Sequence, residues 1–446
     1  MRTKREQVAA HRFIVRRIVS AMVSGEPETL DLPMRRMATT AVVSVAIAAL
    51  VFAGFWVVGL VWPGGAQSWQ QNGAVIVEAE TGTRYVYWEG TLHPVRNYAS
   101  ALLIISSGDR TVHEVHQSSL AGTPRGALLG IPDAPDALPA ADSFTASPWQ
   151  TCSAPSANDP TKRESHVVIG SDLKGGSTLG DHGILLSYGK KIYLVIGSTR
   201  YQVPGREDLP ALGARADDIV AADAVLINSL HTGPDLALSI PHDGDAGPDI
   251  DGASHKVGDL FSNNGHDYVL LDDGLSPIGK LAAELIGTAV TALPTAVIGA
   301  NQSDTVVEPE GFPSHPPTLE SRLASATSAI CTRYARGDMD VRVFRDVPQR
   351  LSDNLTAAPQ GEDSVATADH VWLPGGSGAL VRAAASPKAK GGTVFLVTDQ
   401  GWKFGLTSAA RSALGYRGVK PAPIPSALVA LLPTGPDLSQ SAALSP

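Results

Sequence analysis

The sequence predicts an α+β protein that is anchored in a membrane by a single transmembrane helix. A cytosolic amphipathic helix precedes the anchor, and an elongated extracytoplasmic domain with a central, mostly β core follows it. Three observations support this prediction: the uncharged run Ala41–Trp62, the excess of basic residues before this run, and internal repeats in the remainder of the chain. The repeats predict four small units of β-hairpin and helix in a pseudo-twofold arrangement around the core.

The run Ala41–Trp62 is long enough to cross a bilayer. Its 22 residues, at about 1.5 Å of helix rise each, match a hydrocarbon core of roughly 30 Å. Trp56 and Trp62 lie toward its far end, where indole rings favour the headgroup region. A cleaved signal peptide would have a shorter apolar core and leader, and a buried helix of a soluble domain would seldom stay uncharged for so long. A single-pass anchor is therefore the preferred interpretation.

The basic residues around this run are distributed unevenly. Residues 1–36 hold eight Lys or Arg, and no further basic residue follows until Arg84. The positive-inside rule therefore places the N-terminus in the cytosol and the bulk of the chain outside the cytoplasmic membrane. Within the arm, Gln7–Val23 has apolar residues at helical spacing among three arginines, which predicts an amphipathic helix. This helix could lie on the inner leaflet or dock on a cytosolic partner.

The composition bounds the class of protein. The 44 glycines and 32 prolines predict many turns and short elements. The net charge of −9 argues against nucleic-acid binding, because a phosphate-binding surface normally carries a basic excess. Cys152 and Cys331 are the two cysteines, and both fall outside the cell by the topology argument. A lone pair in an oxidising compartment predicts one disulfide, with two free thiols as the alternative.

The extracytoplasmic part contains an internal repeat. At an offset of 202 residues, Ile192–Val195 matches Val394–Val397, Ala211–Gly213 matches Ala413–Gly415, and Thr232–Leu236 matches Thr434–Leu438. A shorter version, offset by 183 residues, relates Tyr85–Gly90 to Tyr268–Gly274. The residues that mark the repeat are Tyr193, Leu194, Val195, Gly233, Pro234, Asp235, Phe395, Leu396, Val397, Gly435, Pro436 and Asp437. We interpret each unit as an apolar hairpin with a tight turn, followed by a helix.

Such a unit cannot bury its apolar face alone, so the units must pack on one another or on a shared core. The expected organisation is a cytosolic arm (1–36), a transmembrane helix (37–63), four repeat units (64–124, 189–240, 241–294 and 391–446) and a core in two parts (125–188 and 295–390). Cys152 lies in the first part of the core and Cys331 in the second. A disulfide between them would join the two halves of the chain.

Several segments, in this order and spacing, resemble one known family. They are His11–Arg17 before the anchor, then Gly90–Ala101, Pro124–Pro135, Trp149–Cys152 and the Thr-Gly-Pro-Asp-Leu ends of the repeats. Together they resemble the EccB family of the actinobacterial type VII (ESX) secretion machinery over nearly the whole chain. The resemblance implies a membrane component that sits with the EccC motor ATPase, EccD, EccE and a mycosin protease. It also implies several copies around a central channel, and an ectodomain with a core, four repeat units and one disulfide.

Members of this family are sometimes described as ATPases, but the sequence lacks a nucleotide motif. A P-loop needs a Gly-Lys-[Ser/Thr] end, so that backbone amides and a lysine hold the phosphates. Lys174–Ser177 and Gly375–Gly378 are rich in glycine and lack this end. The sequence therefore predicts no catalytic residue and no cofactor.

No metal ligands are predicted either. The acidic loop 243–251 departs from a calcium loop, since Gly247 and Pro248 occupy the fifth ligand position and the glycine position. His113 and His116 have the spacing of a metal-binding pair, but no third ligand is signalled nearby.

Two functions from different classes follow. The first is a structural and assembly subunit of the type VII secretion membrane complex, which supports protein export across the cytoplasmic membrane. The second is a membrane-anchored module that binds peptidoglycan through its repeat units, since repeated small units are a common basis of multivalent binding. Tyr87, Trp88, Tyr193, Tyr201 and Trp402 could stack on sugars, although core packing explains them more simply.

Overall fold

The computed structural model describes residues 3–25, 33–61, 68–105, 111–320, 323, 326–352, 366–386 and 388–445. The chain divides into two compact units. The smaller unit contains the N-terminal residues up to 70, together with residues 78–81 and 114–123. The larger unit contains residues 71–77, 82–113 and 124–446, and thus most of the β-sheet structure.

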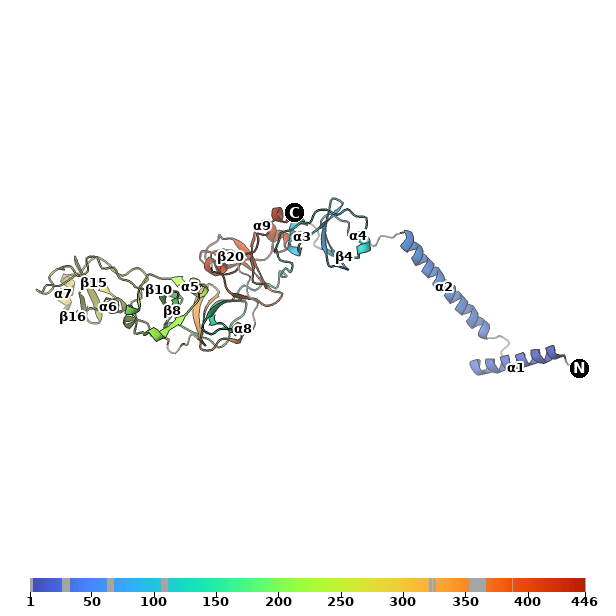
Figure 1. Cartoon of the computed structure of the whole chain (residues 1–446), viewed down its shortest axis with the longest axis horizontal. Coiled ribbons are helices and arrows are strands. Elements are labelled where there is room, and N and C mark those ends of the chain that lie inside the picture. The colour runs from blue at the N-terminus through green and yellow to red at the C-terminus, as the bar shows by residue number, and fades with distance from the viewer. Residues whose placement is uncertain are drawn as a thin grey trace. The chain divides into compact units, whose positions relative to one another are not determined.

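The first helix, α1 (Lys4–Ser24), contains the amphipathic segment predicted for the arm (Figure 1). At its start the Glu6 carboxylate accepts the backbone N–H of Thr3 at 3.1 Å. At its end Gly25 adopts a left-handed φ of 72°, which a residue without a Cβ adopts at little cost. Its exposed apolar side chains are those of Val8, Phe13, Ile14, Val15, Ile18, Val19 and Met22, of which Met22 is 84% exposed.

The second helix, α2 (Pro33–Val61), contains the predicted anchor. Its segment Met37–Val58 has a mean hydropathy of 2.6 and is unburied, so its length and composition suit a membrane span. Proline fits the first helical position, because its missing N–H would have no partner within the helix. Trp56 is exposed, whereas Trp62 and residues 26–32 lie outside the described residues.

Four of the five sheets share one topology, in which an antiparallel meander of three strands is followed by a strand that pairs with the first. The first sheet contains β1 (Ala74–Glu78), β2 (Arg84–Trp88), β3 (Thr91–Pro94) and β4 (Val112–Val115). The second contains β8 (Gly183–Tyr188), β9 (Lys191–Ile196), β10 (Thr199–Val203), β11 (Ile219–Ala221) and β12 (His231–Thr232). The third contains β13 (Leu260–Asn263), β14 (His266–Leu271), β15 (Gly274–Ile278) and β16 (Val290–Ala292). The fourth contains β20 (Gly378–Ala384), β21 (Val394–Thr398), β22 (Lys403–Leu406) and β23 (Ala422–Pro425).

Short helices connect and cover these strands. The α-helices are α3 (Tyr98–Ile105), α4 (Gln117–Leu120), α5 (Ala224–Ser229), α6 (Lys280–Ile286), α7 (Thr295–Ala300), α8 (Gln349–Ser352), α9 (Ser408–Ala413), α10 (Ser426–Ala430) and α11 (Gln440–Ala443). The 3₁₀ helices are η1 (Arg206–Asp208), η2 (Pro210–Leu212) and η3 (Ala216–Asp218). In the second, third and fourth sheets, the strand after the meander runs parallel to the first strand. A connection between parallel strands needs a crossover segment, which these short helices and the loops beside them supply.

The second and fourth repeat units begin earlier in the sequence than the repeat predicts, because each includes one more strand at its start. β8 and β20 lie inside the expected core segments 125–188 and 295–390, yet they pair with β9 and β21. Their first residues, Gly183 and Gly378, are 195 residues apart (378 − 183). The offset falls short of 202 because the connection between the first two strands is longer by seven residues in the fourth unit. The repeat in the sequence was therefore visible only from the second strand onward.

The fifth sheet lies at the centre and has the order β19-β6-β5-β17-β18-β7. Its strands are β5 (Trp149–Pro155), β6 (Arg163–Ile169), β7 (Ser177–Thr178), β17 (Ala329–Ala335), β18 (Asp338–Phe344) and β19 (His370–Trp372). Neighbouring strands are antiparallel except for β19, which pairs with β6 in parallel. β5 is buried along its whole length, so this sheet forms the mostly β core that the sequence predicts.

Shared apolar clusters join the sheets within the larger unit. The second unit packs Val195 and Leu226 against Ile330 and Val341 of the central sheet, and the fourth packs Val381 and Val397 against Trp149 and Val167. The first unit shares a cluster with the fourth, and the third unit packs α6 against the second. The second and fourth units thus pack on the central sheet. The third unit packs on the second and the first unit on the fourth, which is the pseudo-twofold arrangement. The α+β class is confirmed.

Candidate functional site

The repeat residues occupy equivalent positions in the second and fourth units. Backbone N–H groups of Gly233 and Leu236 donate to the third strand β10, and those of Gly435 and Leu438 donate to β22 in the same way. In β9 and β21, the middle strands of the two meanders, Leu194, Val195, Leu396 and Val397 are fully buried, Tyr193 is buried and Phe395 is half-buried. Pro234 and Pro436 are half-buried, and Asp235 and Asp437 are exposed. Most of the marked residues therefore build the fold.

The predicted disulfide is present between Cys152 of β5 and Cys331 of β17. The two residues face each other in the antiparallel register of the central sheet, and both are completely buried. The bond spans 179 residues of sequence, so it joins the two parts of the core. A buried cross-strand bond without a free thiol nearby suits a structural role.

A polar network lies beside the disulfide. The Arg163 guanidinium donates to the carbonyl oxygens of Ser153 and Ser328 at 2.5 and 2.9 Å, and its burial lowers the pKa of Arg163 to about 10. Asp223 begins α5 by accepting the N–H of Leu226 at 2.8 Å. Burial raises the pKa of Asp223, because the charged carboxylate loses hydration there. These groups cross-link β5, β6 and the start of β17, and none is exposed enough to act on a large substrate.

A second polar group combines residues that are distant in the sequence. Glu164 and His166 lie two residues apart on β6, and His370 of β19 pairs directly with His166. His370 Nε2 lies 3.2 Å from Glu164 Oε2, and the two imidazoles stack with centroids 4.8 Å apart. Burial and then the charge of His370 lower the pKa of His166 to about 4. The sequence interpretation missed this cluster, although the alternation Glu-x-His on a strand does place both side chains on one face.

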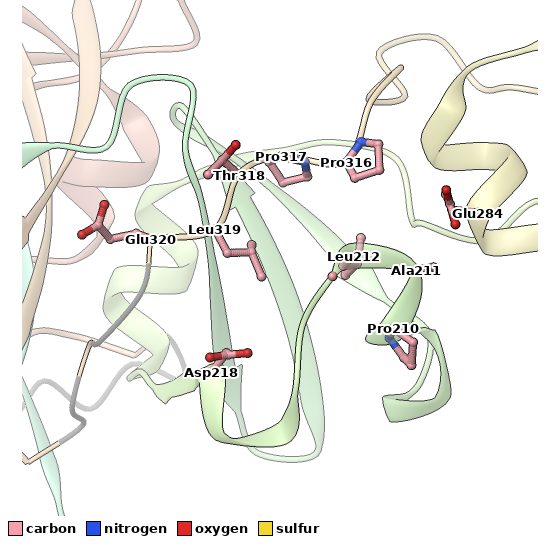
Figure 2. A pocket seen from close by; sticks show the side chains of 11 residues that line it. Pro210, Ala211, Leu212, Asp218, Glu284, Pro316, Pro317, Thr318, Leu319 and Glu320 are labelled. Carbon is pink, nitrogen blue, oxygen red and sulfur yellow. The ribbon is translucent and has the colours of Figure 1, made fainter. Parts of the chain in front are cut away.

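A cleft of about 520 Å³ lies between η2 and the segment Pro316–Glu320 (Figure 2). Three carboxylates line it, those of Asp218, Glu284 and Glu320, together with prolines and leucines. Glu320 accepts from Arg345 at 3.1 Å. Among the residues that the structure describes, no histidine, cysteine, lysine or arginine belongs to this lining. An acidic cleft of this kind repels the phosphates of a nucleotide, and the reactive groups of its described lining are these three carboxylates and the Thr318 hydroxyl.

The two glycine-rich segments do not have the surroundings of a P-loop. Lys174–Ser177 leads into strand β7 and Gly375–Gly378 leads into strand β20, whereas a P-loop leads into a helix whose N-terminus holds the phosphates. His116 Nδ1 lies 3.0 Å from Glu80 Oε1, so this histidine is hydrogen-bonded to a carboxylate. In the acidic loop, Asp249 accepts from the Ser254 hydroxyl at 2.9 Å.

Within the described residues, one helix long and apolar enough to span a membrane precedes four small sheets and a disulfide-linked central sheet, which defines the class of membrane proteins with an N-terminal anchor and a large β-rich domain. The family model "Type VII secretion system ESX-1, transport TM domain B" matches residues 1–446, and the chain belongs to this family, EccB. The resemblance seen in the sequence is thus confirmed.

Curated relatives match along almost the whole chain. The ESX-3 secretion system ATPase EccB3 of Mycolicibacterium smegmatis is 26% identical over 476 residues, covering 99% of this chain and 90% of that protein. The ESX-5 secretion system ATPase EccB5 of Mycobacterium marinum is 26% identical over 482 residues, with coverage of 99% and 92%. The word ATPase in these names belongs to the relatives.

Solved structures have the same fold. The EccB3 dimer from the ESX-3 core complex matches with a TM-score of 0.61 and 25% identity, covering 84% of this chain and 100% of that chain. A chain of the intact ESX-5 inner membrane complex matches with a TM-score of 0.63 and 23% identity, covering 100% and 95%. The chain is therefore similar, over its anchor and its repeat units alike, to components of ESX membrane complexes.

Proposed function

We propose that this chain is a structural and assembly subunit of a type VII secretion membrane complex, where it supports protein export across the cytoplasmic membrane. The observation that carries the proposal is the family match over residues 1–446, together with the shared fold of chains from ESX membrane complexes. An anchor, an exposed amphipathic helix and a domain of repeated small sheets are suited to holding other chains in place rather than to catalysis.

In this proposal α2 spans the cytoplasmic membrane, α1 is cytosolic and the sheets are extracytoplasmic. The eight basic residues of 1–36 support this orientation. A disulfide between Cys152 and Cys331 also fits an oxidising compartment. The proposed partners are the EccC motor ATPase, EccD, EccE and a mycosin protease, together with further copies of this chain. The relative solved as a dimer supports self-association.

We propose no ATPase activity for the chain itself. The Gly-rich segments lack the Gly-Lys-[Ser/Thr] end of a P-loop, and three carboxylates line the cleft beside η2. Phosphate binding needs oriented amides or cationic groups. The energy for export would therefore come from a partner, the motor ATPase.

Peptidoglycan binding is a second candidate function. Trp88 of the first unit and Tyr188 of the second are 38% and 46% exposed, and each lies at the turn of a β-hairpin. Exposed aromatic rings on repeated units can stack on sugars and gain from multivalency. This activity would be compatible with a place in a complex that crosses the cell envelope.

The test of the assembly role is export in a strain from which the gene is deleted. The full chain should restore export of type VII substrates, and a form that lacks residues 1–25 but keeps α2 should insert into the membrane without restoring it. Unchanged export in the deletion strain would contradict the proposal. Sedimentation of the protein with purified cell wall, and its loss in Trp88→Ala and Tyr188→Ala, tests the second function separately.

A further inference from the structure

The cluster of Glu164, His166 and His370 lies at one edge of the central sheet. β19 is a strand of three residues that joins this edge through three register pairs with β6, of which His370 with His166 is the first. Residues two apart on a strand point to the same face, so Glu164 lies on the face of His166. One potential ligand atom from each of the three side chains lies within 4.8 Å of the others.

The two imidazoles have unused nitrogen atoms. Nδ1 of His166 and Nδ1 of His370 are buried and have no hydrogen-bond partner within the described part of the chain. His166 is only 2% exposed. A buried polar atom without a partner is costly, so the nitrogen atoms of two facing histidines are available to a ligand here.

We propose that Glu164, His166 and His370 bind a divalent transition-metal ion of the Zn²⁺ class, which fastens the edge strand β19 to β6. Two imidazoles and one carboxylate are a common protein donor set for such ions. At a metal–nitrogen distance of about 2.1 Å, tetrahedral ligands lie roughly 3.3 Å apart. The donors must therefore move closer together than their present spacing when an ion binds.

The surroundings of the cluster suit a bound cation. The Glu164 carboxylate is held by the Ser156 hydroxyl, whose Oγ lies 2.6 Å from Oε1. The Asp369 carboxylate lies next to His370 in the chain and accepts both the N–H and the hydroxyl of Ser165 at 2.8 and 2.7 Å. The charges that act on His166 thus include the carboxylates of Glu164 and Asp369 and the guanidinium of Arg163, and the last is engaged with backbone carbonyls. The side chains of His370 and Glu164 remain 17% and 31% exposed, so an ion can enter from solvent.

The proposed ion has a structural consequence. β19 precedes the first strand of the fourth unit, β20, by a short connection. A three-residue edge strand has few backbone hydrogen bonds of its own, so a metal bridge would stabilise the join between the core and the fourth unit. A ligand that binds the folded state alone raises stability by RT ln(1 + [L]/Kd), so the stability should rise with the free concentration of the ion.

The experiment uses the full chain in mild detergent, purified by a tag without histidine and treated with a chelator. Titration with CoCl₂ should produce the visible absorption bands of coordinated Co²⁺ and saturate at one ion per chain. ZnCl₂ should displace the Co²⁺ and raise the midpoint of thermal unfolding. No bands, or no saturable binding, would overturn the proposal.

Three variants locate the ion. Glu164→Gln keeps the size of the side chain and an oxygen for Ser156, and His370→Gln removes one imidazole; each should weaken Co²⁺ binding about tenfold or more. His116→Gln is the matched control, because it alters the histidine pair 113 and 116 and should bind as the unmodified chain does. Should His370→Gln fail to fold, Glu164→Gln decides. Full binding by folded Glu164→Gln, or loss in His116→Gln alone, would overturn the assignment.

Discussion

Gly233 lies directly against the ring of Tyr201, so that a Cβ on this glycine would come within 2.6 Å of the ring carbon Cδ1. The fourth unit repeats the relationship with Gly435 and Phe404, where the distance would be 2.7 Å. In the first unit Gly126 approaches the ring of His93 in the same manner. In each of these units, the segment whose N–H groups donate to the third strand carries a glycine. We call it the closing segment, and an aromatic or imidazole ring of the third strand leaves no room there for a Cβ.

The third unit lacks both the glycine and the ring at the equivalent positions. Here the N–H of Ser303 donates to Leu275, which places Ser303 where the other units have glycine. The third strand carries Ser276 at the position of the ring. A side chain is tolerated at one position because the ring is absent at the other, so the two positions act as one packing pair.

This packing predicts that Gly435→Ala destabilises the chain. The Phe404 ring is only 2% exposed and cannot move aside, so the free energy of unfolding should fall by about 1–3 kcal/mol, as in other overpacked cores. Gly233→Ala should cost less, since Tyr201 is half-buried and can rotate toward solvent. The measurement is chemical denaturation of the full chain in detergent. Gly375→Ala is the control, because a Cβ there meets nothing within 4 Å, and an equal loss in this control would refute the packing explanation.

The disulfide predicts a marked dependence of stability on redox conditions. Replacing Cys152 and Cys331 together by Ala should lower the free energy of unfolding, by up to about 5 kcal/mol in the chain-entropy model. The bond spans 179 residues, and long loops lose most entropy in the unfolded state. Thermal unfolding with and without reductant checks this. An unfolding midpoint that is the same in both conditions would show that strand pairing of β5 and β17 alone holds the two halves.

Lys403 is expected to stabilise the fourth unit. It is 7% exposed, and its ammonium donates to the carbonyl of Leu432 at 2.6 Å and to that of Ala430, at the end of α10, at 3.4 Å. Lys403→Met keeps the apolar stem but leaves these carbonyls without the donor, so unfolding should require about 1–3 kcal/mol less. Lys191→Met, on the exposed start of β9, serves as the control and should change little. Equal stability of both variants would count against the role.

His242 provides a test of pH dependence. Its Nδ1 lies 2.5 Å from the Asp272 carboxylate, and this hydrogen bond raises the pKa of His242 above its usual 6.5. The stabilising contribution of the pair is therefore present below pH 6.5 and is lost as the pH rises through the raised pKa. NMR titration of ¹³C-labelled histidine should detect the shift, and Asp272→Asn should return the pKa toward its ordinary value. A His242 pKa that does not respond to this substitution would contradict the pairing.

Local sequence patterns predicted much of the fold. The apolar run of α2 and the helical spacing of α1 are continuous signals, and the middle strands β9 and β21 each carry their own repeat. The sequence repeat places β8 and β20 in the core. The connection from β20 to β21 is longer than that from β8 to β9, so the 202-residue offset does not align β8 with β20. Only strand pairing assigns them to their units.

The candidate site was less accessible from sequence. His166 and His370 are 204 residues apart (370 − 166), and parallel pairing of β19 with β6 alone brings them together. Neither belongs to a short motif with ligand spacing. The contacts of the repeat glycines could not be predicted for the same reason. Gly233 and Gly435 meet the rings of Tyr201 and Phe404 only because the chain folds each glycine beside the third strand of its unit.

The central claim is that this chain works by assembling with others. The deciding experiment extracts the full chain from the membrane in mild detergent and measures the mass of the species that contains it by native electrophoresis. Mass spectrometry then identifies the proteins that accompany the chain. We expect an assembly many times the mass of the 46.4 kDa chain, containing a motor with several ATPase domains and a polytopic membrane protein. A lone 46.4 kDa species, stable in several detergents and retained on purified cell wall, would contradict it.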